Sequence, residues 1–165
     1  MGFNFIGGEF KENAKQLINL IRGWRYFSKT EVVVGITDET NVERDNGMSN
    51  ASLLYLHENG VPSHNIPPRP VLRPAIAEDG TKQKIEMMMK TAAEEAIVHG
   101  NTENAQKYME RAGMVGRDAC KNYITKGGKL APNAESTIRK KGSSTPLVDT
   151  ASMLNSITYA VRKKK

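Results

Sequence analysis

The sequence has little of the chemistry that marks disulfide scaffolds or membrane proteins. Its single cysteine, Cys120, excludes an intrachain disulfide and is typical of a reducing compartment. Because Cys120 falls inside a helical pattern, we expect it to be a small buried hydrophobe. No run of about 18 apolar residues occurs, so no membrane span is predicted. The N-terminal residues lack the charged, apolar and small-residue order of a secretory signal, so we expect a protein made and used in a cytoplasm.

Motifs for catalysis and metal binding are also missing. The chain contains no G-x-S-x-G, no P-loop and no G-x-G-x-x-G. Its three histidines, His57, His64 and His99, are scattered, whereas a metal site needs three or four converging ligands. The paired acids Glu94 and Glu95 lie on the polar side of a helical pattern. We therefore expect no catalytic residue, no cofactor and no bound metal, and predict that the protein is not an enzyme.

Aromatic residues make up only 6 % of the chain, while hydrophobic residues make up 38 %. This composition argues against global disorder and predicts a modest core of Met, Leu, Ile and Ala within one domain, residues 1–165. The formal net charge is +6, and part of the excess lies in the last four residues, Arg162 to Lys165. A basic balance suits nucleic acid, an acidic partner or simple solubility. For the terminal cations we expect a frayed, solvated tail.

The first predicted element is a helix over residues 9–28. Its apolar residues recur at helical spacing and form one stripe, which consists of Phe10, Ala14, Leu17, Ile18 and Ile21, extended by Trp24 and Phe27. We expect this stripe to pack on the core. The alternative is an amphipathic helix that docks on a neighbouring chain. Gly23 weakens the helix near its end, by about 1 kcal/mol relative to Ala.

The remaining pattern predicts a helix-rich α+β fold with a small antiparallel sheet. A β-branched strand at 30–37 and an alternating strand at 157–161 are expected to pair. The first predicted helix after the strand runs from Ser49 or Asn50 to about His57. The next begins at Pro70 or Pro74 and ends at His99, with a break or bend at Asp79-Gly80. Two more helices are predicted over 102–125 and 132–142, and a last one runs up to Ile157 after a cap at Asp149 or Thr150.

Five of the seven prolines lie between Leu53 and Ala77. Proline fixes φ, lacks an N–H and favours an extended residue before it, so residues 60–70 are expected to form a stiff proline-rich arm without regular backbone pairing of its own. Such an arm suits contact with another chain more than catalysis. The residues expected at this interface are Val61, Ile66, Pro67, Pro68, Arg69, Pro70 and Arg73, the arginines as donors to carboxylates of the partner.

Three blocks of sequence follow one another in a specific order. They are HENG at 57–60 with IPPRPVLRPA at 66–75, LAPN at 130–133 with TIRKKGSS at 137–144, and PLVDT at 146–150 with MLNSI at 153–157. Together they resemble the neck and tail-completion proteins of tailed bacteriophages, the head–tail joining or virion morphogenesis group. The match covers about residues 51–161 and leaves the N-terminal helix, 1–28, outside it.

That resemblance implies a structural role in the virion. The expected protein forms a homo-oligomeric, hexameric ring between the head connector and the tail tube or tail terminator, assembled in the host cytoplasm, with genomic DNA passing through the lumen. Two positions depart from the pattern of the group: Val71 stands where Phe is common and Ala151 where Gly is common. From Ala151 we expect a turn that needs no positive φ. The alternative function is a small basic nucleic-acid-binding module that uses the C-terminal cations.

Overall fold

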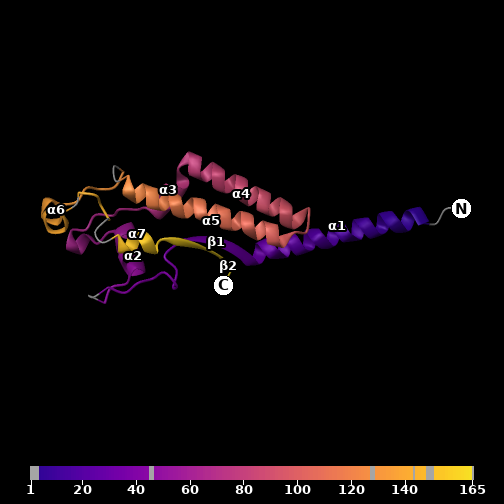
Figure 1. The fold of residues 1–165 in the computed structure, drawn as a ribbon, viewed down its shortest axis with the longest axis horizontal. Helices are drawn as coiled ribbons and strands as arrows, with labels where there is room; N and C mark the ends of the chain where they lie inside the picture. Colours follow the sequence, from indigo (N-terminus) through magenta and orange to yellow (C-terminus); the bar gives the residue numbers. More distant parts are fainter. Residues whose placement is uncertain (1–3, 45–46, 127–128, 143, 148–150, 165) are drawn as a thin grey trace.

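The computed structural model describes residues 4–44, 47–126, 129–142, 144–147 and 151–164. The described chain is mostly helical with one two-stranded antiparallel sheet, which confirms the predicted α+β class. Helices α4 (Asp79–Ile97) and α5 (Thr102–Thr125) form a hairpin along the centre of the molecule (Figure 1).

Helix α5 packs on more of the other elements than any other helix of the described chain does. It begins at the predicted residue because the Asn101 side chain accepts a hydrogen bond from the N–H of Asn104 at 2.9 Å. Its inward side carries mainly small residues, namely Ala105, Met109, Ala112, Gly113, Gly116, Cys120 and Ile124. The predicted bounds 102–125 and the burial of Cys120 are confirmed.

The sheet lies against α5. Strand β1 (Thr30–Gly35) pairs with β2 (Thr158–Lys163), with Val33 opposite Ala160, so the predicted pairing of the two strand regions is confirmed. A β-carbon at Gly116 would stand only 2.9 Å from Cγ2 of Val34. Small residues on α5 therefore allow the sheet to approach closely.

Short helices close the other end of the fold. They are α2 (Asn50–Asn59), the 3₁₀ turn η1 (Pro62–His64), α3 (Leu72–Ala77), α6 (Glu135–Lys141) and α7 (Ser152–Ser156). Ser49 caps α2 as predicted, since its Oγ accepts from the N–H of Ser52 at 3.2 Å. The predicted bend at Asp79-Gly80 lies one residue earlier, at Glu78, whose ψ of 129° separates α3 from α4.

The polar contact between α2 and α7 is buried. Asn50 is fully buried, and its amide donates to the hydroxyls of Ser152 at 2.9 Å and Ser156 at 2.8 Å. Buried polar groups that are satisfied in this way fix how two elements meet. The predicted caps of α7, Asp149 and Thr150, lie outside the described residues, and the residue at the N-cap position is Ala151.

Ala151 corrects one expectation from the sequence. Its φ is 59°, in the left-handed region, so the turn before α7 does have a positive φ. A side chain with a β-carbon is strained there, and glycine is not. The glycine that is common at this position in the resembled group would therefore suit this backbone.

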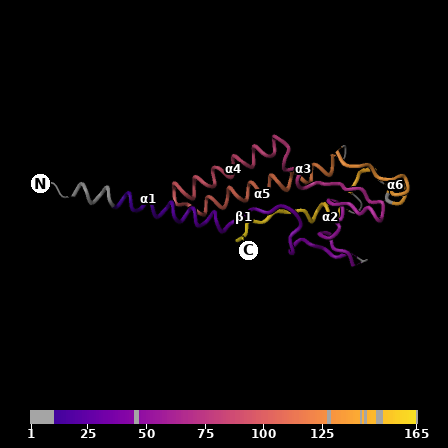
Figure 2. Tube along the Cα trace, turned by 180° about the vertical axis from the view of Figure 1, so that it is seen from behind, coloured from indigo at the N-terminus to yellow at the C-terminus, as the bar shows by residue number. Residues whose placement is uncertain are grey.

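Helix α1 (Asn4–Lys29) runs directly into β1 and leaves the body of the molecule. Gly23 packs on α4, and Asn19 lies beside Gly100 at the turn of the α4–α5 hairpin. The part of α1 before Asn19 extends beyond that turn (Figures 1 and 2). Within the described residues, no helix combines the length and apolar content needed to cross a membrane.

The core has two parts. One lies between the sheet, α3, the C-terminal half of α5 and α7, with Val71, Ile124 and Ile157 at its centre. The other lies between α1, α4 and α5, where Tyr26 and Phe27 pack near Met109. Alanines, methionines and branched aliphatic residues dominate both, as the low aromatic content predicts.

Candidate interaction surfaces

The first candidate surface is the proline-rich arm, residues 60–70. Val61 and Ile66 exchange two backbone hydrogen bonds of 2.8 and 3.1 Å, and η1 lies between them. Asn65 completes this closed loop with a φ of 54°. The expectation of an arm without backbone pairing of its own is therefore wrong for Val61 and Ile66.

Arg69 is the residue of this arm that the structure places most differently from the prediction. It is 8 % exposed, and its guanidinium donates to the carbonyl oxygens of Ala131 and Pro132, both at 2.8 Å. Its own N–H donates to the carbonyl of His57. Arg69 thus connects three segments of one chain, and these hydrogen bonds occupy donors that were expected to reach a partner.

The other predicted interface residues lie nearer the surface. Val61 and Ile66 are half-buried within the closed loop. The four remaining residues are exposed: Pro67, Pro68, Pro70 and Arg73. The structure therefore leaves these four accessible, and their contact with another chain stays a prediction.

Sequence reasoning missed the role of Glu58. One carboxylate oxygen of Glu58 accepts the N–H groups of Val71 at 2.6 Å and Leu72 at 2.8 Å, at the start of α3. The residue at the N-cap position, Val71, has no side-chain acceptor. The sequence contained a signal for this role. No Ser, Thr, Asp or Asn directly precedes the helix predicted to begin at Pro70 or Pro74, so an acceptor for its first N–H groups must come from elsewhere.

A cleft of about 770 Å³ lies beside this framework. Residues of all three resembling blocks line it, including His57, Ile66, Arg69, Pro132 and Leu147. Arg44 and Lys140 add positive charge, and no carboxylate is among the lining residues. The cleft is therefore basic and partly apolar.

The second candidate surface is on α1. Its exposed apolar side chains are Leu17, Ile18, Leu20, Ile21 and Trp24, each between 49 and 68 % exposed. We call these five residues the outward stripe. The expectation that the apolar stripe packs on the core is wrong for Leu17, Ile18, Ile21 and Trp24, because α1 contacts α4 through Gly23 instead. It is confirmed for Phe27, which packs on the core, and the side chain of Phe10 lies outside the described ones. A β-carbon at Gly23 would stand 2.5 Å from the carbonyl oxygen of Ala96.

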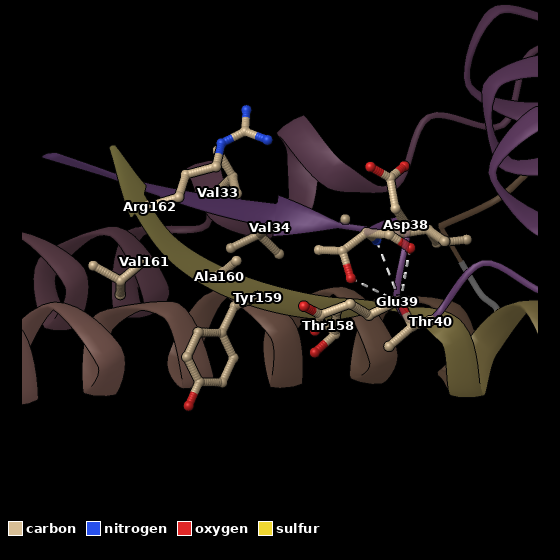
Figure 3. Close-up of a pocket in the computed structure, with 13 residues that line it drawn as sticks. Val33, Val34, Asp38, Glu39, Thr40, Thr158, Tyr159, Ala160, Val161 and Arg162 are labelled. Carbon is tan, nitrogen blue, oxygen red and sulfur yellow. Dashed lines mark hydrogen bonds between the residues drawn. The ribbon is translucent and has the colours of Figure 1, made fainter. Parts of the chain in front are cut away.

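The third candidate surface is the side of the sheet that faces away from α5. Figure 3 shows Tyr159 and Val161 directed toward the helix, and Val33 and Arg162 directed away from it. A cleft of about 520 Å³ lies along both strands. Arg162 Nε donates to the Glu31 carboxylate at 2.9 Å at one end, and the exposed acids Asp38 and Glu39 follow β1 at the other.

Reactive chemistry is sparse at these surfaces. In the described parts of the chain, no group of three or more His, Cys, Asp or Glu residues could hold a metal ion. Burial raises the pKa of the Cys120 thiol to about 11, so the thiol stays protonated at neutral pH and is a poor nucleophile. Burial likewise raises the pKa of Tyr26, with a smaller contribution from the charge of Glu110. The buried Tyr26 hydroxyl has no hydrogen-bond partner among the described residues.

No protein-family model, curated protein or solved structure matches this chain. The surfaces described above and the three sequence blocks are therefore the basis for a functional proposal.

Proposed function

We propose that this chain is a structural virion protein of a tailed bacteriophage that forms a ring in the neck, between the head connector and the tail tube. The phage assignment rests on the three ordered sequence blocks that resemble head–tail joining proteins. The structural observation that supports an assembly role is the outward stripe of α1.

The resembling blocks contribute to one framework in the fold. Glu58 in the first block holds the start of α3, and Arg69 holds the carbonyls of Ala131 and Pro132 in the second. Ser156 in the third block accepts a hydrogen bond from buried Asn50. These contacts stabilise the fold and supply no reacting group, which agrees with a structural role.

The outward stripe indicates a protein that is completed by a neighbour. Five large apolar side chains on one helix side are at least 49 % exposed, although the opposite side of the same helix already packs on α4. Contiguous exposed apolar surface of this kind marks protein–protein or membrane contact, and in a ring it would be covered by the next copy. Closed rings use two different surfaces of each subunit at every contact.

The partners in this proposal are further copies of the chain, the head connector on one side and tail proteins on the other. Genomic DNA passes through the lumen without sequence-specific recognition. Assembly takes place in the cytoplasm of the host, and the mature location is the virion.

A nucleic-acid-binding module remains the second candidate, and one observation favours it. The expectation of a frayed tail is wrong for Lys164, whose N–H donates to the carbonyl of Lys29 at 2.8 Å. Lys163 pairs with Thr30 in the sheet. Lys163 and Lys164 thus lie close to Lys29 at one end of the sheet, where a phosphate could approach them.

Two measurements on the purified chain separate these functions. Light scattering coupled to size exclusion, followed by negative-stain microscopy, should show a closed ring with a central opening. A monomer at all concentrations tested would contradict the ring. Titration with fluorescent duplex DNA at increasing salt tests the alternative, because binding to phosphates weakens steeply with salt whereas assembly through apolar contacts does not.

A genetic measurement tests the place in the virion. In a phage that encodes this chain, a stop codon in the gene should give filled heads and complete tails that fail to join. Infectious particles of normal yield without the protein would overturn the proposal.

A further inference from the structure

Helix α1 cannot cover its own outward stripe. α1 ends at Lys29 and β1 begins at Thr30, so no linker allows the helix to fold back over the sheet that follows it. Its other side is fixed to α4 at Gly23. The part before Asn19 extends beyond the hairpin turn (Figure 1). Whatever covers the stripe therefore comes from another molecule.

The charges next to the stripe restrict the choice of that molecule. Five cations and two anions lie on α1. At 100° per residue the cations fall along one border of the stripe, and they are Lys11, Lys15, Arg22, Arg25 and Lys29. All five are exposed. Two such helices would repel each other, whereas a surface with exposed acids would attract this border.

The same chain offers such a surface on its sheet. We call Glu31, Val33, Ala160 and Arg162 the outer sheet face, because the register places them together on the side away from α5. Val33 and Ala160 form an apolar strip, and Glu31 and Arg162 neutralise each other beside it. At the far end Asp38 and Glu39 are exposed, and neither forms an ion pair with another described residue.

We propose that the outward stripe of α1 in one copy docks on the outer sheet face of the next copy, with the basic border of α1 toward Asp38 and Glu39. The stripe supplies large apolar side chains, and the sheet supplies an open cleft of about 520 Å³ with a small apolar floor. The contact joins two different surfaces, so it is head-to-tail and repeats around a ring. This inference rests on the proposed function, because it takes the molecule that docks with the outward stripe to be a second copy of the chain.

Site-directed cross-linking tests which surfaces meet. The full chain carries one cysteine, which is buried, so single engineered cysteines report on their own surroundings. Ile21→Cys marks the stripe and Val33→Cys marks the outer sheet face. Met87→Cys on α4 and Tyr55→Cys on α2 are matched controls, because both native side chains are exposed and neither belongs to the outward stripe or the outer sheet face.

Under oxidation, a mixture of the Ile21→Cys and Val33→Cys chains should give a disulfide-linked mixed dimer, while either chain alone and either control mixture should give much less. Strong cross-linking of Ile21→Cys alone would show stripe-to-stripe pairing and overturn the proposal. Assembly that persists in light scattering without the mixed cross-link would also overturn it and leave the ring function standing. A chain that never assembles would overturn both.

Charge reversal provides an independent test of the same contact. Asp38→Lys with Glu39→Lys should raise the dissociation constant of the assembly by about tenfold, and so should Lys15→Glu with Arg22→Glu. Combining both pairs should restore much of the affinity, because opposite charges face each other again. All four side chains are exposed, so the variants should fold, which circular dichroism checks. Additive weakening instead of restoration would contradict the proposed orientation.

Discussion

Gly23 of α1 and Ala96 of α4 lie so close that a β-carbon added to Gly23 would stand 2.5 Å from the Ala96 carbonyl oxygen. This contact fixes the direction in which α1 leaves the body and therefore which of its sides faces outward. A glycine that weakens the helix by about 1 kcal/mol locally is what allows the two helix backbones to meet.

Gly23→Ala should therefore destabilise the chain despite the better helix propensity of alanine. The added β-carbon would meet backbone atoms of α4, which cannot rotate away, so the overpacking cost lies toward the upper end of about 1–3 kcal/mol and exceeds the propensity gain of about 1 kcal/mol. Urea unfolding at equilibrium measures the difference. Gly80→Ala in the first turn of α4 is the matched control, because nothing lies within 4 Å of the added β-carbon, and it should be neutral or stabilising. Equal effects of the two substitutions would show that α1 does not pack through Gly23.

Arg69→Lys should lower the free energy of unfolding by about 2 kcal/mol, because an ammonium group cannot hold the carbonyls of Ala131 and Pro132 in the same forked geometry. Arg73→Lys, at an exposed position in the same segment, should change the stability by less than about 0.5 kcal/mol. Thermal or urea unfolding of both variants makes the comparison. If Arg69→Lys were as stable as the native chain, the predicted intermolecular role of Arg69 would regain support over the intrachain one.

Ala151→Gly should stabilise the protein by about 1 kcal/mol, because glycine relieves the left-handed strain at a φ of 59°. Ala134→Gly is the comparison, since Ala134 precedes α6 with a φ of −63° and gains no such relief. Glycine raises the conformational entropy of the unfolded chain, so the Ala134→Gly variant should be slightly less stable than the native chain. Melting temperatures of the two variants that shift in the same direction would contradict the strain.

Burial of Cys120 predicts a pH dependence of stability. The pKa of its thiol is raised from 9.0 to about 11, chiefly by burial and next by the charge of Glu58. Between these values the unfolded chain releases the proton while the folded chain keeps it, so stability falls as pH rises through this window, by about 3 kcal/mol for this group. Below the unfolded pKa the contribution is fully present.

Chemical unfolding at a series of pH values, compared between the native chain and Cys120→Ala, isolates this contribution. At alkaline pH the free energy of unfolding of the alanine variant should fall less than that of the native chain, whatever the absolute stability of the variant. Parallel profiles of the two chains would show that Cys120 is not the responsible group. Lys129 and Tyr26 also have raised pKa values, and they remain in both chains.

The sequence by itself determined the elements whose causes are local. The bounds of α5 follow from the Asn101 cap and a long helical periodicity, and the two strands follow from β-branched and alternating residues. The pairing of those strands could also be predicted, because each needed an antiparallel partner and the pattern offered no other strand. The absence of catalytic motifs was readable in the same way.

Only the tertiary structure decided which side of α1 is buried and what Arg69 and Glu58 do. Periodicity identifies an apolar stripe, but backbone-to-backbone fit at Gly23, which no hydrophobic pattern encodes, places that stripe outward. Arg69 and Glu58 contact backbone groups of other segments, and any residue can supply a carbonyl or an N–H. A contact to a backbone group does not depend on which amino acid supplies that group, so the sequence of the contacted segment does not reveal it. Only the three-dimensional structure shows such contacts.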